Sequence, residues 1–102
     1  MTKNHDSITD AAAAERMPQW RIEDSTAHLQ AKGRSFADAI RFVTGVAELA
    51  EAADHHPDID IRFNRVRLAL SSHDVGSLSD RDVALGEQIV RLAEEQGLTV
   101  SA

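Results

Sequence analysis

Apolar residues recur along this chain with two periods, one typical of helices and one typical of strands. A helical period predicts a long helix that begins at Phe36 and is capped by Ser35. The helix is expected to end near residues 54–56, because Pro57 disfavours helical geometry in the residue before it. Its expected inward stripe consists of Phe36, Ile40, Val43, Ala47 and Ala50, widened by Ala39 and Val46.

Two further helices are predicted, one toward each end of the chain. A short helix with its body at residues 11–16 is capped by Ser7 or Thr9. The last helix runs over about residues 80–95, and Ser79 precedes it in the position of a capping residue. Its expected inward residues are Leu85, Ile89 and Leu92.

Between the helices, apolar residues alternate with period two, which is typical of strands. Residues 20–32 indicate two short strands around a turn at residues 23–26. Residues 59–63 and 66–70 indicate a second hairpin, with a tight turn at residues 64–65. The side chains expected on the inner face of its first strand are Ile59, Ile61 and Phe63.

The predicted order of elements is helix, two strands, helix, two strands, helix. Hairpins that bury one face under helices predict an α+β fold. This is a two-layer sandwich, in which helices cover one face of a four-stranded antiparallel sheet. We expect a single domain over residues 1–102, with residues 1–6 disordered.

Composition and charge narrow the functional classes. The chain has 102 residues, 42% of them apolar and 27% charged, which predicts a folded domain. It has no cysteine, so disulfides and thiolate ligands are excluded. A net charge of −6 disfavours nucleic acid as a partner, and no apolar run is long enough to span a membrane. We therefore expect a cytoplasmic protein with neither a nucleic-acid nor a membrane partner.

Three of the five histidines lie close together in the sequence. His55 and His56 are adjacent at the expected end of the long helix, and His73 follows the last predicted strand. Asp82 comes nine positions later, at the start of the last helix. Because histidine exchanges protons near neutral pH, the group suggests acid–base chemistry, a metal site or a pH switch.

Each of these residues also has a purely structural interpretation. A histidine at a helix C-terminus interacts favourably with the helix dipole, and Asp82 can simply cap a helix. Three histidines and an acid are suitable ligands for zinc or iron, but adjacent histidines point apart, which leaves a site made of one of them with His73 and Asp82. General acid–base catalysis fits better, with Asp82 or Glu51 setting a histidine tautomer or stabilising an imidazolium.

The most specific part of the sequence is a double histidine before proline, followed by a third histidine after a strand and then by Asp82. With the residues around this set, the chain resembles the pterin-4a-carbinolamine dehydratases over about residues 20–89. The resemblance is densest over residues 36–84. The matching residues are Phe36, Ala39, Phe42-Val43, Val46-Ala47, Ala50-Glu51, Asp54-His55-His56-Pro57, Asn64-Arg65-Val66, Leu70-Ser71-Ser72-His73, Leu78-Ser79, Asp82 and Ala84.

The resemblance implies the same four-stranded sheet, assembly into homodimers or homotetramers, and no metal or organic cofactor. The implied activity is loss of water from a 4a-hydroxytetrahydropterin substrate, which gives a quinonoid dihydropterin and belongs to tetrahydrobiopterin recycling. The family's catalytic residues fall on His55, His56, His73 and Asp82. Contact with the pterin falls on His55, His56, Glu51 and Ser72.

Several residues depart from the family's pattern, among them Ile59, which stands where some members carry tryptophan. Ala31 and Gly33 replace an aromatic pair on the second strand, which is expected to loosen that strand or its use in assembly. Ser77 replaces a glycine in the loop, beside the retained Gly76. We expect these changes to affect the substrate fit and the oligomer more than the reaction.

Two other functions stay open at this point. One is a non-catalytic protein-binding module on the same scaffold, such as a dimerisation cofactor of a transcription factor. The other is a hydrolase or isomerase that acts on another heterocycle through the same residues. The three histidines favour an enzyme over a binding module, because protein binding does not require them.

Overall fold

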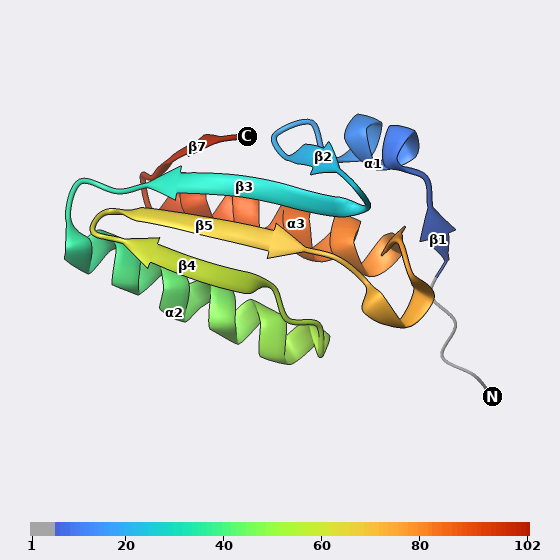
Figure 1. Ribbon diagram of the computed structural model, residues 1–102. Coiled ribbons are helices and arrows are strands. Elements are labelled where there is room, and N and C mark those ends of the chain that lie inside the picture. Colours follow the sequence, from blue (N-terminus) through green and yellow to red (C-terminus); the bar gives the residue numbers. More distant parts are fainter. Residues whose placement is uncertain (1–5) are drawn as a thin grey trace.

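The computed structural model describes residues 6–102 (Figure 1). Residues 1–5, which make up most of the segment expected to be disordered, lie outside this part. The helices are α1 (Asp10–Arg16), α2 (Phe36–Ala53) and α3 (Asp80–Glu95), with a short 3-10 helix, η1, at His73–Val75. The strands are β1 (Ser7–Ile8), β2 (Arg21–Glu23), β3 (Thr26–Lys32), β4 (Asp58–Arg62), β5 (Arg65–Leu70), β6 (Leu78–Ser79) and β7 (Thr99–Ser101).

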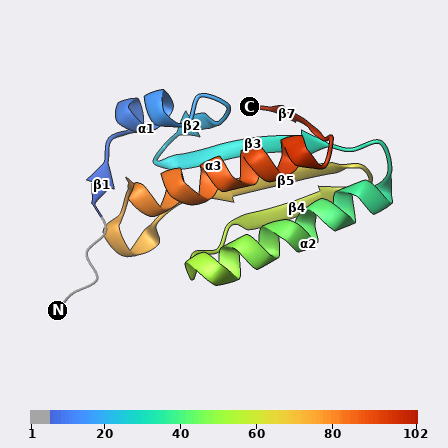
Figure 2. The ribbon, with the colours of Figure 1, turned by 180° about the vertical axis from the view of Figure 1, so that it is seen from behind.

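The main sheet is antiparallel and has five strands, one more than predicted: four have the order β2-β3-β5-β4, and β7 pairs with β3 beside this row. Helices α2 and α3 lie on one face of it, as Figures 1 and 2 show from opposite sides. This arrangement confirms the predicted α+β class with two layers. The core lies between the layers and includes Phe42 and Val46 of α2, Leu68 and Leu70 of β5, and Ile89 of α3.

Two strand pairings go beyond the predicted order. The C-terminal β7 pairs with the end of β3, and β1 pairs with β6 in a separate two-stranded sheet. Each of these added strands has only two or three residues, which is too short for an alternating pattern to be recognised. Ser7 belongs to β1, and the cap of α1 is Thr9, whose Oγ1 accepts from the Ala12 N–H at 3.1 Å.

The predicted inward stripe of α2 is wrong in part. Phe36 and Ile40 are 52% and 38% exposed, and Ala47 is exposed as well. The buried residues of α2 are Ala39, Val46 and Ala50, which the prediction included, and Phe42, which it did not. The helix is rotated about its axis relative to the prediction because it also packs closely against α3. A Cβ on Gly45 would lie 2.7 Å from a methyl carbon of Leu92, so α2 must turn this glycine toward α3.

The turn between β4 and β5 begins one residue earlier than predicted. Arg62 pairs with Arg65, so Phe63 and Asn64 form the turn. Phe63 has a left-handed backbone with φ of 53° and is 70% exposed, which corrects its expected place on the inner face. Asn64 Nδ2 donates to the Gly33 carbonyl and Gly33 N–H donates to the Asn64 carbonyl, both at 2.8 Å.

The end of β3 is paired with a strand on both sides. Its small residues, Ala31 and Gly33, therefore do not loosen the strand as expected. Ala31 is fully buried and pairs with Val66 of β5 on one side and with Val100 of β7 on the other. A Cβ on Gly33 would lie 2.8 Å from the Cβ of Asp38, so this position favours glycine. The C-terminal strand β7 therefore supports β3 where larger side chains are absent.

Candidate active site

The way α2 ends turns His55 into the protein. Asp54 follows the helix with a left-handed backbone (φ 51°), and the His55 N–H then donates to the Ala50 carbonyl at 3.1 Å. This reversal leaves His55 only 8% exposed, whereas the next residue, His56, is exposed. The two adjacent histidines therefore occupy different environments.

Asp82 is the buried partner of His55. Its carboxylate is fully buried in the first turn of α3, and Oδ1 lies 2.6 Å from His55 Nε2. Oδ2 accepts hydrogen bonds from Ser79 N–H at 2.9 Å and from the Ser72 hydroxyl at 2.7 Å. The expected capping box of Ser79 and Asp82 is present, and the same carboxylate also holds the histidine.

The hydrogen bonds of Asp82 fix the positions of the protons around it. A carboxylate only accepts hydrogen bonds, so His55 Nε2 donates to it, and Nδ1 is the free acceptor of the neutral ring. The Ser72 and Ser79 hydroxyls are 2.7 Å apart. Because Ser72 gives its single proton to Asp82, Ser79 donates to Ser72. The result is an oriented imidazole with one ring nitrogen left for proton exchange.

His56 and Glu51 form a second pair at the surface. His56 Nε2 lies 2.6 Å from Glu51 Oε2, and the side chains are 56% and 76% exposed. An exposed pair of this kind contributes at most about 1 kcal/mol to stability, so its main effect is on the orientation of the ring. The exposed position leaves the histidine open to a ligand.

His73 lies in η1, in the loop between β5 and β6. It is exposed, and its Nε2 lies 3.2 Å from the Ser71 hydroxyl. Together with Ser72 it lines a hollow of about 220 Å³. An ion pair between Asp74 and Arg81 connects this loop to α3. The loop, the end of α2 and the start of β3 lie at the same end of the molecule (Figure 1).

The candidate residues thus fall into three groups. His55, Asp82 and Ser72 share one buried network, His56 pairs with Glu51, and His73 lies apart with Ser71. Ser79 is a further participant that the sequence indicated only as a helix cap. Its spacing to Asp82 gave the signal for the cap, but the contact of its hydroxyl with Ser72 depends on the tertiary structure.

Comparison with known proteins identifies the family. A family model described as pterin 4 alpha carbinolamine dehydratase matches residues 3–92. The chain belongs to this family. A relative from Chloroflexus aurantiacus is 49% identical over 85 residues, which cover 80% of this chain and 91% of the relative. Another from Thermomicrobium roseum is 41% identical over 88 residues, or 86% of this chain and 95% of the relative. Both carry the provisional name pterin-4-alpha-carbinolamine dehydratase.

Two solved structures share the dehydratase fold with this chain. A transcriptional coactivator/pterin dehydratase from Brucella melitensis superposes with a TM-score of 0.79 at 24% identity, covering 86% of this chain and 99% of that one. A pterin dehydratase-like protein described as a RuBisCO assembly factor in the alpha-carboxysome gives 0.61 at 19% identity, covering 72% and 86%. At these identities the likeness concerns the fold alone.

Two further observations concern metal ligands and membrane spans in the described part of the chain. Within residues 6–102, no group of three or more histidine, aspartate or glutamate side chains is arranged to hold a metal ion. The same part of the chain contains no helix of the length and apolar character needed to cross a membrane. The metal alternative therefore has no geometric support among these residues.

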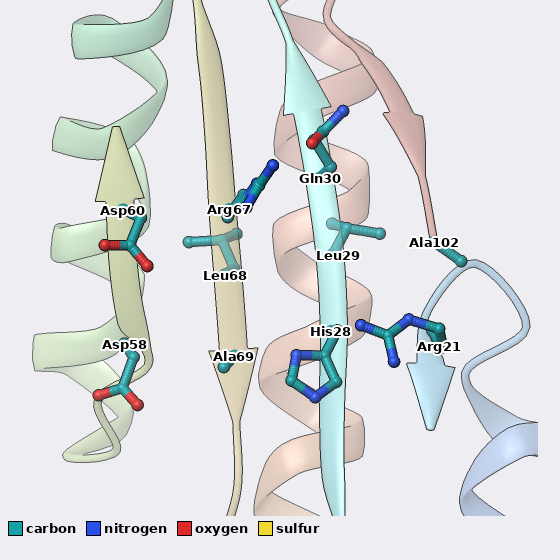
Figure 3. Close-up of a pocket in the computed structure, with 10 residues that line it drawn as sticks. All are labelled: Arg21, His28, Leu29, Gln30, Asp58, Asp60, Arg67, Leu68, Ala69 and Ala102. Atoms are coloured by element: carbon teal, nitrogen blue, oxygen red, sulfur yellow. The ribbon is translucent and has the colours of Figure 1, made fainter. Parts of the chain in front are cut away.

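A larger hollow, of about 410 Å³, lies on the face of the sheet that α2 and α3 leave open (Figure 3). Asp58 and Asp60 line it from β4, Arg67 lines it from β5, and His28 lines it from β3. Opposite charges on neighbouring strands are typical of a solvated sheet face. Because none of the candidate catalytic residues lines this hollow, we place the site at the end of the sheet.

The tautomer of His55 provides a direct test of the buried network. In Asp82→Asn, the amide oxygen can keep the bonds from Ser79 and Ser72, which leaves the amide NH₂ facing His55. The ring must then accept at Nε2 and carry its proton on Nδ1. We expect imidazole ¹⁵N shifts, recorded where the histidine is neutral, to show Nε2–H in the wild type and Nδ1–H in the variant. An unchanged tautomer would mean that Asp82 does not orient the ring.

Proposed function

We propose that this protein catalyses the dehydration of 4a-hydroxytetrahydropterins, such as 4a-hydroxytetrahydrobiopterin, to quinonoid dihydropterins, and that it serves tetrahydrobiopterin recycling in the cytoplasm. The observation that carries the proposal is the buried His55–Asp82 pair beside the exposed His56–Glu51 pair. These pairs occur in a chain that belongs to the dehydratase family, with relatives at 41–52% identity.

The reaction requires two proton transfers and no electron transfer. The bond between C4a and the hydroxyl oxygen breaks with its electron pair on oxygen, and a proton donor converts the leaving group into water. A ring nitrogen supplies the electrons for the new C=N bond and then loses its proton to a base. Since proton donors and acceptors suffice for both steps, the proposed mechanism needs neither a metal nor an organic cofactor.

The proposed roles follow from the setting of each side chain. His55, oriented by Asp82, and His56, paired with Glu51, contact the pterin and transfer protons. His73 acts as their partner acid or base from the opposite side of the site. Glu51 and Ser72 belong to the substrate-binding wall, and Ser72 lines the hollow beside His73 while its hydroxyl supports Asp82.

Replacing a histidine of the cluster should lower turnover, whereas replacing a histidine elsewhere in the protein should not. We expect His73→Ala to lower kcat/KM for 4a-hydroxytetrahydropterin dehydration by about 10² to 10⁴, the usual effect of losing a general acid or base. The double variant His55→Ala/His56→Ala should lose at least as much. His28→Ala, on the open face of the sheet, is the matched control and should retain the wild-type rate.

Stopped-flow absorbance of the dehydration step measures these rates, with a chelator-treated sample that should behave like the untreated one. A wild-type protein without turnover would contradict the proposal. In that case the second candidate, a non-catalytic protein-binding module, would take its place. Roles that involve other proteins are described for the two solved structures, one a transcriptional coactivator/pterin dehydratase and the other a RuBisCO assembly factor.

We also propose that the protein forms homodimers or homotetramers. Strand β4 lies at the edge of the main sheet, and an unpaired edge is a ready site for association. The bonds between Gly33 and Asn64 place the end of β4 beside the start of α2. The large exposed apolar side chains of this region are Phe36, Ile40, Ile61 and Phe63. A second copy of the chain would cover both features.

Charge introduced at this edge should separate the copies. We expect Phe36→Glu/Ile61→Glu to sediment as a monomer at protein concentrations where the wild type is a dimer or tetramer, because association would bury the new carboxylates. Ala37→Glu is the control, since this exposed position lies off the apolar stripe of α2. A wild-type protein that stays monomeric, or a double variant that associates equally well, would argue against the proposal.

A further inference from the structure

The hollow beside His73 has a second wall that comes from a distant part of the chain. Residues 24–26, at the turn between β2 and β3, face Ser71, Ser72 and His73 across a space of about 220 Å³. The two walls meet because β3 and β5 are neighbours whose last pair at this end is Ala27 with Leu70. Beyond this pair the chains diverge and leave the hollow between them.

The turn is held in a conformation that its residues do not favour. Asp24 and Ser25 both have left-handed backbones, with φ of 51° and 61°. Neither is glycine, and each such residue costs about 1 kcal/mol or more. The Ser25 N–H donates to Asp10 Oδ2 at 3.2 Å, so α1 holds the turn in place. The surrounding structure therefore keeps Asp24 at the rim of the hollow.

Most of the side chains that line the hollow carry a polar group. Serine and threonine hydroxyls contribute from both walls, and Asp24 adds an exposed carboxylate. Hydroxyls that already donate to the protein still accept, and a carboxylate only accepts. Apart from the imidazole of His73, no aromatic side chain and no large apolar side chain lines the hollow, whereas a flat heterocycle favours such walls. The volume also lies below the roughly 300–1,000 Å³ of pockets that enclose a whole ligand.

These properties match one part of a pterin substrate, the hydroxylated chain carried by C6. In a pterin ring, the reacting C4a and the substituted C6 are both bonded to N5. A hydroxyl that leaves from C4a therefore lies within a few ångströms of the side chain on C6. His73 is a proposed acid or base of the reaction and also lines the hollow, so the two parts of the substrate would reach their sites together.

We propose that this hollow receives the polyhydroxylated C6 side chain of the pterin, and that Asp24 is a specificity-determining residue that accepts hydrogen bonds from its hydroxyls. The assignment rests on the proposed dehydratase function. It predicts a preference for pterins with a hydroxylated side chain over pterins with a bare alkyl group at C6. Asp24 has no part in the proton transfers, so its effect is confined to binding.

The test compares two substrates, 4a-hydroxytetrahydrobiopterin with its dihydroxypropyl chain and 4a-hydroxy-6-methyltetrahydropterin. Asp24→Gly removes the carboxylate, and glycine adopts the left-handed conformation freely, so the turn is preserved. We expect KM to rise about tenfold for the first substrate, the usual effect of losing a hydrogen bond to a charged group. KM for the 6-methyl substrate and kcat for both should change less than about twofold.

Glu23→Gln is the control, because this neighbouring acid pairs with Arg21 and does not line the hollow. Equal changes in KM for both substrates, or no change for either, would overturn the role of Asp24. Failure of the wild-type protein to dehydrate either pterin is a different result. It would overturn the proposed function and this assignment with it.

Discussion

The buried carboxylate of Asp82 is the interaction on which the rest of the structure depends. A carboxylate without solvent contact is costly unless hydrogen-bond donors surround it. Here the donors come from three segments, namely His55 after α2, Ser72 after β5, and Ser79 at the start of α3. The carboxylate therefore fixes the relative positions of the two large helices and the central strand, and the site forms only when these elements have assembled.

The same constraint gives the two adjacent histidines different properties. The left-handed backbone at Asp54 sends His55 inward to Asp82, where its orientation is fixed, and leaves His56 outside with Glu51. A rigid imidazole with a defined tautomer and an accessible one that can carry charge make a suitable pair for moving protons on and off a small substrate. Both depend on one backbone reversal at the end of α2.

Local signals in the sequence predicted much of this fold. Ser35 and the Ser79–Asp82 box mark their helix starts because a cap is formed by neighbouring residues. The side of α2 that faces the core was harder to predict, because apolar residues at helical spacing lie on two of its sides. Only the close approach of Leu92 to Gly45 decides between these two sides. The turn at Phe63 shifted because Asn64 bonds to Gly33, which is far away in sequence. The site residues could be named from the family resemblance, but which acid faces which histidine depends on tertiary contacts.

The most direct test of the central claim is the rate of 4a-hydroxytetrahydropterin dehydration by Asp82→Asn, with circular dichroism to confirm that the variant is folded. Because the carboxylate orients His55, we predict a loss of about 100-fold or more in kcat/KM in a folded protein. A folded variant with a rate within a few-fold of the wild type would contradict it. The buried network would then be structural only, and the catalytic work would have to lie with His56 and His73.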